Sequence, residues 1–225
     1  MLFRSSPLYL EGSRLALAEV VALGFAAPAV AASITYARLG SRRWLSVAVG
    51  LALVSLLVKP ITLGLALPLA IAVLIRGRSG IVDALIVGTG ALVIAVLVIL
   101  GVGLAGVLDQ IVDYRKVSIE SEGWSLKKNW RALQAAWSFE PSGIFALAGV
   151  SSLALLILRR WDGLIAIAWG VGCIVLLLSY TPLHGKHAVT VMPALAAVAG
   201  SGLGTVLLRA RTTQFPKQLV IVAPV

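Results

Sequence analysis

The sequence predicts an all-α, polytopic integral membrane protein with about seven transmembrane helices, forming a single transmembrane domain over residues 1–225. Apolar residues make up 60% of the chain and charged residues 12%, whereas a soluble domain carries roughly 45–50% apolar and about 25% charged residues. This composition excludes a soluble enzyme, a disordered tail and a secreted disulfide scaffold. No segment alternates between apolar and polar residues over a sustained length, which excludes a membrane β-barrel.

Seven apolar segments account for most of the chain. A helix that crosses a bilayer needs roughly 20 mostly apolar residues. Backbone polar groups that face lipid must be bonded within the protein, so we expect each segment to be helical. The predicted spans are 15–36, 44–58, 61–75, 82–108, 143–158, 163–180 and 188–208.

The segment 44–75 could form one helix or two. One helix of 32 residues would be about 48 Å long, against a hydrocarbon core of about 30 Å. It would place Lys59 and Pro60 at mid-bilayer, where a Lys costs roughly 2.5–3.5 kcal/mol and Pro removes a backbone donor. Two short helices that turn at Lys59-Pro60 avoid this cost, so we predict a hairpin there.

The net charge of +10 lies in short clusters between the apolar segments. Such clusters set membrane topology, so the expected partner is the lipid bilayer and not a nucleic acid. With the hairpin, one side carries ten basic residues and two acids, and the other carries nine basic residues and seven acids. The positive-inside rule places the first side in the cytoplasm. Lys59, the loop 109–142 and the turn 181–187 are then extracytoplasmic.

The loop 109–142 contains a predicted amphipathic helix. Apolar residues recur there at i, i+4, i+7 and i+11, which is one helix face, and cations occupy the other faces. Such a helix suits the headgroup layer, either as a simple interfacial helix or as a lid over a lipid-substrate site. The apolar residues are Leu126, Trp130, Leu133 and Trp137. The cations that could meet a phosphate are Arg115, Lys116, Lys127, Lys128 and Arg131.

Three basic side chains, His184, Lys186 and His187, crowd the turn at 181–187. Two His with a Lys between them make a poor metal site, so no metal and no cofactor are expected. Imidazole and ammonium groups donate hydrogen bonds and offset negative charge, which suits a phosphate or pyrophosphate. The alternative is a polar turn that anchors the chain at the interface.

Two more ionisable residues lie within apolar surroundings. Lys59 is unfavourable there unless it reaches water, snorkels or meets an anion. On the same face as the turn 181–187, it could converge with the His residues. Glu19 lies in the outer third of the first span and could pair with Arg14 or with a neighbouring helix. Intramembrane carboxylates are candidate functional groups.

Three segments together resemble a known family. They are SRLALAEVVALGFAA at 13–27, SLLVKPITLGLALPLAI at 55–71 and TPLHGKHAVTVMPALAAVAGSGL at 181–203. In this order they resemble the polyprenyl-phosphate-sugar-dependent membrane glycosyltransferases of the GT-C fold, which include protein-mannosyltransferase and aminoarabinose-transferase relatives. The resemblance covers most of the chain through short, apolar motifs.

The resemblance implies transfer of a sugar from a polyprenyl-phosphate donor to an acceptor on the extracytoplasmic face of a bacterial plasma (inner) membrane; it does not specify the acceptor. It implies that Lys59 and His187, with His184 and Lys186 in support, stabilise the leaving lipid phosphate. The family's general base is an Asp or Glu in the first extracytoplasmic loop, and this chain has no matching loop.

We therefore assign no catalytic residue. We expect a C-terminal membrane portion, or a degenerate relative, of such an enzyme, which binds the lipid phosphate and does not supply the base. The alternative from another class is a non-enzymatic transporter or scaffold subunit. A transporter would carry charged or broken helices near mid-membrane on several spans.

Overall fold

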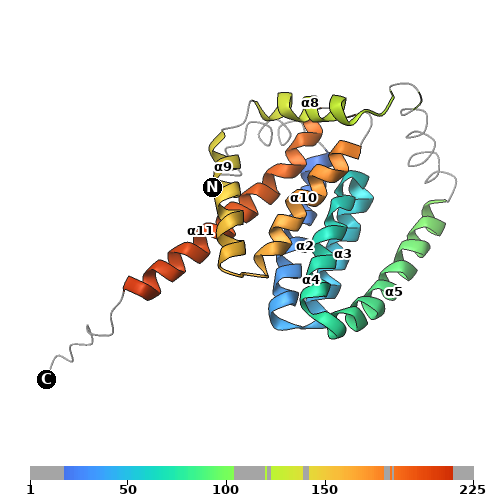
Figure 1. Ribbon diagram of the computed structural model, residues 1–225. Helices are drawn as coiled ribbons and strands as arrows, with labels where there is room; N and C mark the ends of the chain where they lie inside the picture. Colours follow the sequence, from blue (N-terminus) through green and yellow to red (C-terminus); the bar gives the residue numbers. More distant parts are fainter. Residues whose placement is uncertain are drawn as a thin grey trace, which may run out of the picture.

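The computed structural model describes residues 18–103, 120, 123–138, 142–179, 183 and 185–214. Every element in these ranges is helical, which confirms the predicted all-α class for this part of the chain (Figure 1). The α-helices are α2 (Ala18–Leu39), α3 (Arg42–Val58), α4 (Ala66–Ile75), α5 (Gly77–Val102), α8 (Leu126–Trp137), α9 (Ser142–Ile157), α10 (Gly163–Ser179) and α11 (Met192–Gln214). Two 3₁₀ helices are η2 (Pro60–Leu65) and η4 (Gly185–Val191).

Within the described ranges, three helical segments are long and apolar enough to cross a membrane: Ala18–Leu39, Gly77–Gly101 and His187–Ala210. The apolar helices Pro60–Ile75, Gly143–Ile157 and Gly163–Ser179 are shorter. These lengths and compositions support an integral membrane protein. The count of seven spans stays a prediction.

The chain turns back at Lys59, as the hairpin prediction requires. Lys59 is extended (φ −153°, ψ 113°) between the end of α3 and the start of η2. Pro60 occupies the first position of η2, where its missing N–H has no helical partner to lose. The guanidinium of Arg76, after α4, lies against Gly40, just before α3. Both helices therefore reach the same end of the bundle, and the single-helix alternative is excluded.

The predicted span 82–108 has the wrong bounds. α5 begins at Gly77 and ends at Val102, where Gly103 adopts a left-handed backbone (φ 97°). Glycine accommodates this conformation and commonly ends helices. The basic segment 76–81 was expected to connect two spans, yet residues from Gly77 onward belong to the first turns of the helix. The predicted span 188–208 is also not one uniform helix, because it begins within the 3₁₀ helix η4.

Close packing around α10 holds the bundle together. α10 contacts η2, α4 and α11, and Trp169 and Leu177 are fully buried in it. A Cβ added at Gly172 would lie 2.3 Å from the carbonyl oxygen of Gly64 in η2. Two glycines facing each other thus allow the backbones of α10 and η2 to approach closely.

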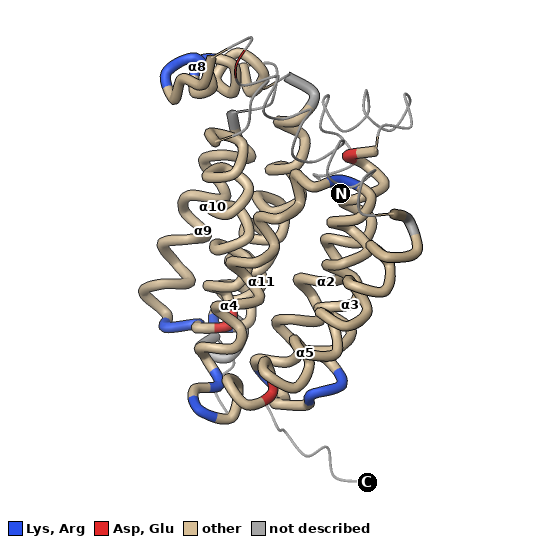
Figure 2. Tube along the Cα trace, turned by 90° about the vertical axis from the view of Figure 1, so that its right-hand side faces the viewer, with Lys and Arg blue, Asp and Glu red and all other residues tan. Residues whose placement is uncertain are grey.

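Arginines gather at one end of the bundle, which we call the arginine-rich end. Figure 2 shows basic segments at the α2–α3, α4–α5 and α9–α10 turns there, whereas α8 lies at the other end. These turns were predicted to share one side of the membrane, and they do lie at one end of the bundle; that this side is cytoplasmic stays a prediction. The arginines of these turns are Arg38, Arg42, Arg43, Arg76, Arg78, Arg159 and Arg160.

Two aspartates link these turns to one another. Arg38 and Arg160 both pair with Asp162, and Arg42 Nε lies 2.8 Å from Asp83 Oδ1. Burial alone would raise the pKa of Asp162, but hydrogen bonds from Arg160 and Arg38 hold it below its ordinary value. The two ion-pair groups therefore connect α2 with the α9–α10 turn, and α3 with α5, at the arginine-rich end.

Candidate functional site

Three ionisable side chains from distant parts of the chain meet at the end of the bundle opposite the arginine-rich end. The carboxylate oxygen Oε1 of Glu19 lies 2.8 Å from His187 Nδ1 and 3.3 Å from Lys59 Nζ. Glu19 and His187 are 168 positions apart in the sequence. We call Glu19, Lys59 and His187 the Glu19 cluster.

Each member of the Glu19 cluster lies at a helix terminus or a break between helices. Glu19 is in the first turn of α2, where a carboxylate interacts favourably with the helix dipole. Lys59 occupies the break between α3 and η2, and His187 lies in η4. Two hydroxyl groups fix these segments: Ser55 Oγ donates to the Ala22 carbonyl at 2.8 Å, and Thr190 Oγ1 donates to the His187 carbonyl at 2.8 Å.

The Glu19 cluster lies about one helix length from the arginine-rich end. α3 has 17 residues, so Lys59 lies about 26 Å along the bundle from the start of that helix. The nineteen helical steps of α2 from Glu19 to Arg38 correspond to about 28 Å. Both lengths are similar to the thickness of a hydrocarbon core, about 30 Å.

Burial and charge define what the cluster can do. The side chains of Glu19 and His187 are 2% and 4% exposed, whereas that of Lys59 is 24% exposed. A buried carboxylate is costly unless it is paired, and here an ammonium and an imidazole satisfy it. With a neutral imidazole the cluster has no net charge, and with a protonated one it has one positive charge. Lys59 is the member that reaches toward the surface.

α8 packs over this end of the bundle, as an amphipathic helix. Its predicted existence is confirmed: Ser125 precedes it, and the Ser125 hydroxyl accepts from the Lys128 backbone N–H at 3.4 Å. Asn129 Nδ2 donates to the Leu178 carbonyl at the end of α10 (2.9 Å), and α8 contacts η4, which carries His187. α8 is thus attached to the two segments beside the cluster.

The predicted apolar face of α8 is packed against the protein only in part. Leu133 is buried, whereas Leu126 and Trp130 are 53% and 43% exposed. The side that packs on the bundle also includes Asn129 and Ala136. Asn129 belongs to this side because its amide donates to the Leu178 carbonyl at the C-terminus of α10.

The structure brings together two of the six residues predicted to bind a lipid phosphate, Lys59 and His187. Arg115, Lys116 and His184 lie outside the described residues, and so does the side chain of Lys186. Among the residues described, no group of three His, Cys, Asp or Glu is placed to hold a metal ion.

Glu19 was not among the predicted phosphate-binding residues, although it proves to be the centre of the cluster. The signal for it was present, because a carboxylate inside an apolar helix requires a partner. Of the two partners expected for it, the neighbouring-helix alternative is correct: His187 and Lys59 hold it, and Arg14 lies outside the described residues.

Comparison of the chain with models of protein families, with curated proteins and with solved structures finds no match. The interpretation of the site therefore depends on its geometry and on the residues that compose it.

Proposed function

We propose that this chain binds the phosphate of a polyprenyl-phosphate-linked sugar at the Glu19 cluster, on the extracytoplasmic face of a bacterial plasma membrane. It would be the C-terminal membrane portion, or a degenerate relative, of a GT-C glycosyltransferase. One observation carries the proposal: Lys59 and His187, from two different family-like segments, meet at one carboxylate.

The depth of the cluster suits a lipid phosphate. A polyprenyl chain lies in the hydrocarbon layer, whereas its phosphate lies at the interface. A cation at the edge of the core can reach that phosphate without crossing the membrane, and Lys59 is the partly exposed member of the cluster. Nitrogen donors that bear or share positive charge form strong hydrogen bonds to phosphate oxygens.

Glu19 would hold the two donors in position while no phosphate is bound. Two cations near lipid are unfavourable without a counter-ion, and the buried carboxylate supplies it. An incoming phosphate then competes with Glu19 for the Lys59 ammonium. The carboxylate continues to orient the imidazole of His187 through Nδ1.

The position of the charges favours this proposal over a transporter. A transporter is expected to carry charged or broken helices near mid-membrane on several spans. Throughout the described ranges, charged residues lie in the terminal turns of the long helices or in the connections between them. The Glu19 cluster itself lies about one helix length from the arginine-rich end.

The proposal is tested by binding of a short-chain polyprenyl phosphate to the protein in lipid nanodiscs. We expect Lys59→Gln and His187→Ala each to weaken binding about tenfold, which corresponds to about 1.4 kcal/mol. The control Arg78→Gln removes an exposed cation at the arginine-rich end and should leave the affinity unchanged. Equal affinities for all three variants would refute the proposed site.

A further inference from the structure

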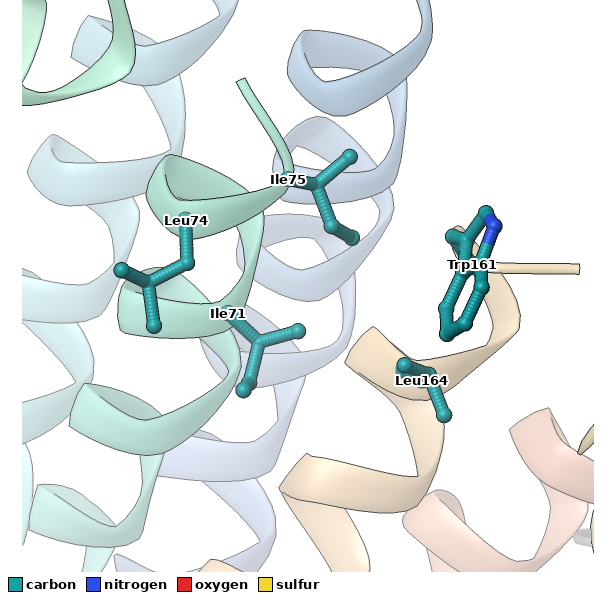
Figure 3. Close-up of a pocket in the computed structure, with 5 residues that line it drawn as sticks. All are labelled: Ile71, Leu74, Ile75, Trp161 and Leu164. Carbon is teal, nitrogen blue, oxygen red and sulfur yellow. The ribbon is translucent and has the colours of Figure 1, made fainter. Parts of the chain in front are cut away.

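An apolar groove opens at the arginine-rich end, far from the Glu19 cluster. It has a volume of about 400 Å³ and lies between the C-terminal end of α4 and the start of α10 (Figure 3). The lining residues are Ile71, Leu74, Ile75, Trp161 and Leu164. Figure 3 shows Ile71 and Ile75 directed toward Trp161 and Leu164 across the opening, whereas Leu74 points away from them. An apolar groove of this kind on a membrane protein suits a hydrocarbon chain.

Arginines flank both walls of the groove in the sequence. Arg76 directly follows Ile75 on one wall, and Arg159 is two positions before Trp161 on the other. Both arginines are exposed, and neither forms an ion pair within the described part of the structure. Arg160, the other neighbour of Trp161, pairs with Asp162. Arg76 lies close enough to Asp83 to interact with it electrostatically, so among the described residues Arg159 supplies the unmatched positive charge at the rim of the groove.

Arg159 adopts a backbone conformation in which glycine is usual. Its φ is +50°, and it follows the end of α9. The N–H of Arg160 donates to the Leu155 carbonyl (2.9 Å), and the N–H of Arg159 donates to the Leu156 carbonyl (3.0 Å). This is the Schellman pattern that favours glycine at the position of Arg159. The chain keeps a cation at a place where glycine would be less strained, and strain of this kind is often found at binding sites.

We propose that this groove holds one acyl chain of an anionic phospholipid, and that Arg76 and Arg159 bind its phosphate. The exposed indole of Trp161 suits the level of the lipid head groups, between the apolar groove and the arginines. Guanidinium groups match phosphate geometry and are the preferred phosphate ligands among cationic side chains. This inference does not depend on the function proposed for the Glu19 cluster, which lies at the opposite end.

The test is native mass spectrometry of the detergent-solubilised full chain with phosphatidylglycerol and phosphatidylcholine that carry the same acyl chains. An arginine near a membrane surface contributes roughly fivefold to binding of an anionic lipid. We expect the wild type to prefer phosphatidylglycerol by about fivefold or more, and the double variant Arg76→Gln/Arg159→Gly to lose most of this preference.

Three further variants distinguish binding in the groove from an effect of general charge and from misfolding. Arg159→Gly removes the cation and also relieves the strained turn, so its lower lipid preference should accompany an unchanged or higher thermal midpoint. Ile71→Trp fills the groove and should lower the retention of both lipids. The control Arg43→Gln removes an exposed arginine of the same end that does not line the groove, and it should leave the lipid preference intact.

Three results would overturn the inference. The first is equal retention of the two lipids by the wild type. The second is an undiminished preference in the Arg76→Gln/Arg159→Gly variant, and the third is normal retention in Ile71→Trp. The variant Lys59→Gln separates this site from the Glu19 cluster, because it should weaken polyprenyl-phosphate binding and leave phosphatidylglycerol binding unchanged.

Discussion

Replacing Glu19 with Gln tests how the negative charge of Glu19 affects the stability of the fold and the binding of a phosphate. Gln keeps the shape and one acceptor oxygen but removes the charge that Lys59 and His187 share. A hydrogen bond to a charged group contributes about 1.5–3 kcal/mol, and removing one partner of a fully buried pair costs about 3–5 kcal/mol. Because Lys59 is 24% exposed and can turn toward water, we expect a loss of about 2–3 kcal/mol of unfolding free energy.

The same substitution should strengthen binding of the lipid phosphate. Without the carboxylate, the phosphate no longer competes for the Lys59 ammonium and meets no nearby negative charge. We expect Glu19→Gln to bind a short-chain polyprenyl phosphate about five- to tenfold more tightly, which corresponds to about 1–1.4 kcal/mol. A variant that is less stable and yet binds more tightly cannot be explained by general damage to the fold.

Stability is measured by denaturant titration in mixed micelles, and affinity is measured in lipid nanodiscs. The control Asp83→Asn acts at the arginine-rich end, where Asp83 pairs with the exposed Arg42 and accepts a hydrogen bond from the Tyr36 hydroxyl at 3.1 Å. Asn keeps an acceptor oxygen for this hydroxyl, and a pair with an exposed arginine contributes about 0–1 kcal/mol, so this control should cost at most about 1 kcal/mol of stability and leave the affinity unchanged. The reasoning fails if Glu19→Gln is as stable as the wild type, or if it loses lipid binding together with stability.

Three other predictions concern the bundle around the site. Gly172→Ala should destabilise the protein by about 1–3 kcal/mol in a denaturant titration, because its Cβ would lie 2.3 Å from the η2 backbone. The control Gly88→Ala should be tolerated in the same titration, because nothing lies within 4 Å of the added Cβ. Asn129→Leu should weaken the attachment of α8 to α10, because the Leu178 carbonyl keeps only the hydrogen bond from Trp124 Nε1 at 3.2 Å. It should make the α8 segment more susceptible to limited proteolysis, unlike Lys127→Leu on the exposed face. The pKa of Asp162 is lower in the folded protein than its ordinary value. The stability that the Asp162 carboxylate gives the fold is therefore complete above the unfolded pKa of about 3.9, and it is lost as pH falls through the folded pKa. Asp162→Asn should therefore remove up to about 1 kcal/mol at neutral pH and flatten the loss of stability in acid; a variant that keeps the full acid sensitivity would contradict this assignment.

Simple membrane energetics predicted the path of the chain well. The cost of placing Lys59 and Pro60 at mid-bilayer was enough to predict the hairpin, and the arginine clusters were enough to group the turns at one end. The start of α5 at Gly77 was missed because the basic segment 76–81, with Arg76 and Arg78, was interpreted as a connection between spans. A helix can continue past the hydrocarbon edge into the head-group layer, so polarity alone does not mark its end.

The candidate site was predicted only in part. Each isolated charge in an apolar segment requires a partner, so the convergence of Lys59 with His187 could be anticipated from the sequence. That Glu19 joins them depends on which faces of α2, α3 and η4 meet, and periodicity does not contain that information. The facing glycines Gly64 and Gly172 were missed for the same reason, since many glycines in apolar helices contact nothing closely.

The most direct test of the account is a double-mutant cycle on polyprenyl-phosphate affinity, with Lys59→Gln, His187→Ala and the combined variant in nanodiscs. If both side chains hold one phosphate, each single variant binds more weakly and the combined loss differs from the sum by more than about 0.5 kcal/mol. Losses that simply add, or an affinity that none of the variants changes, would contradict the claim that the two side chains form one site.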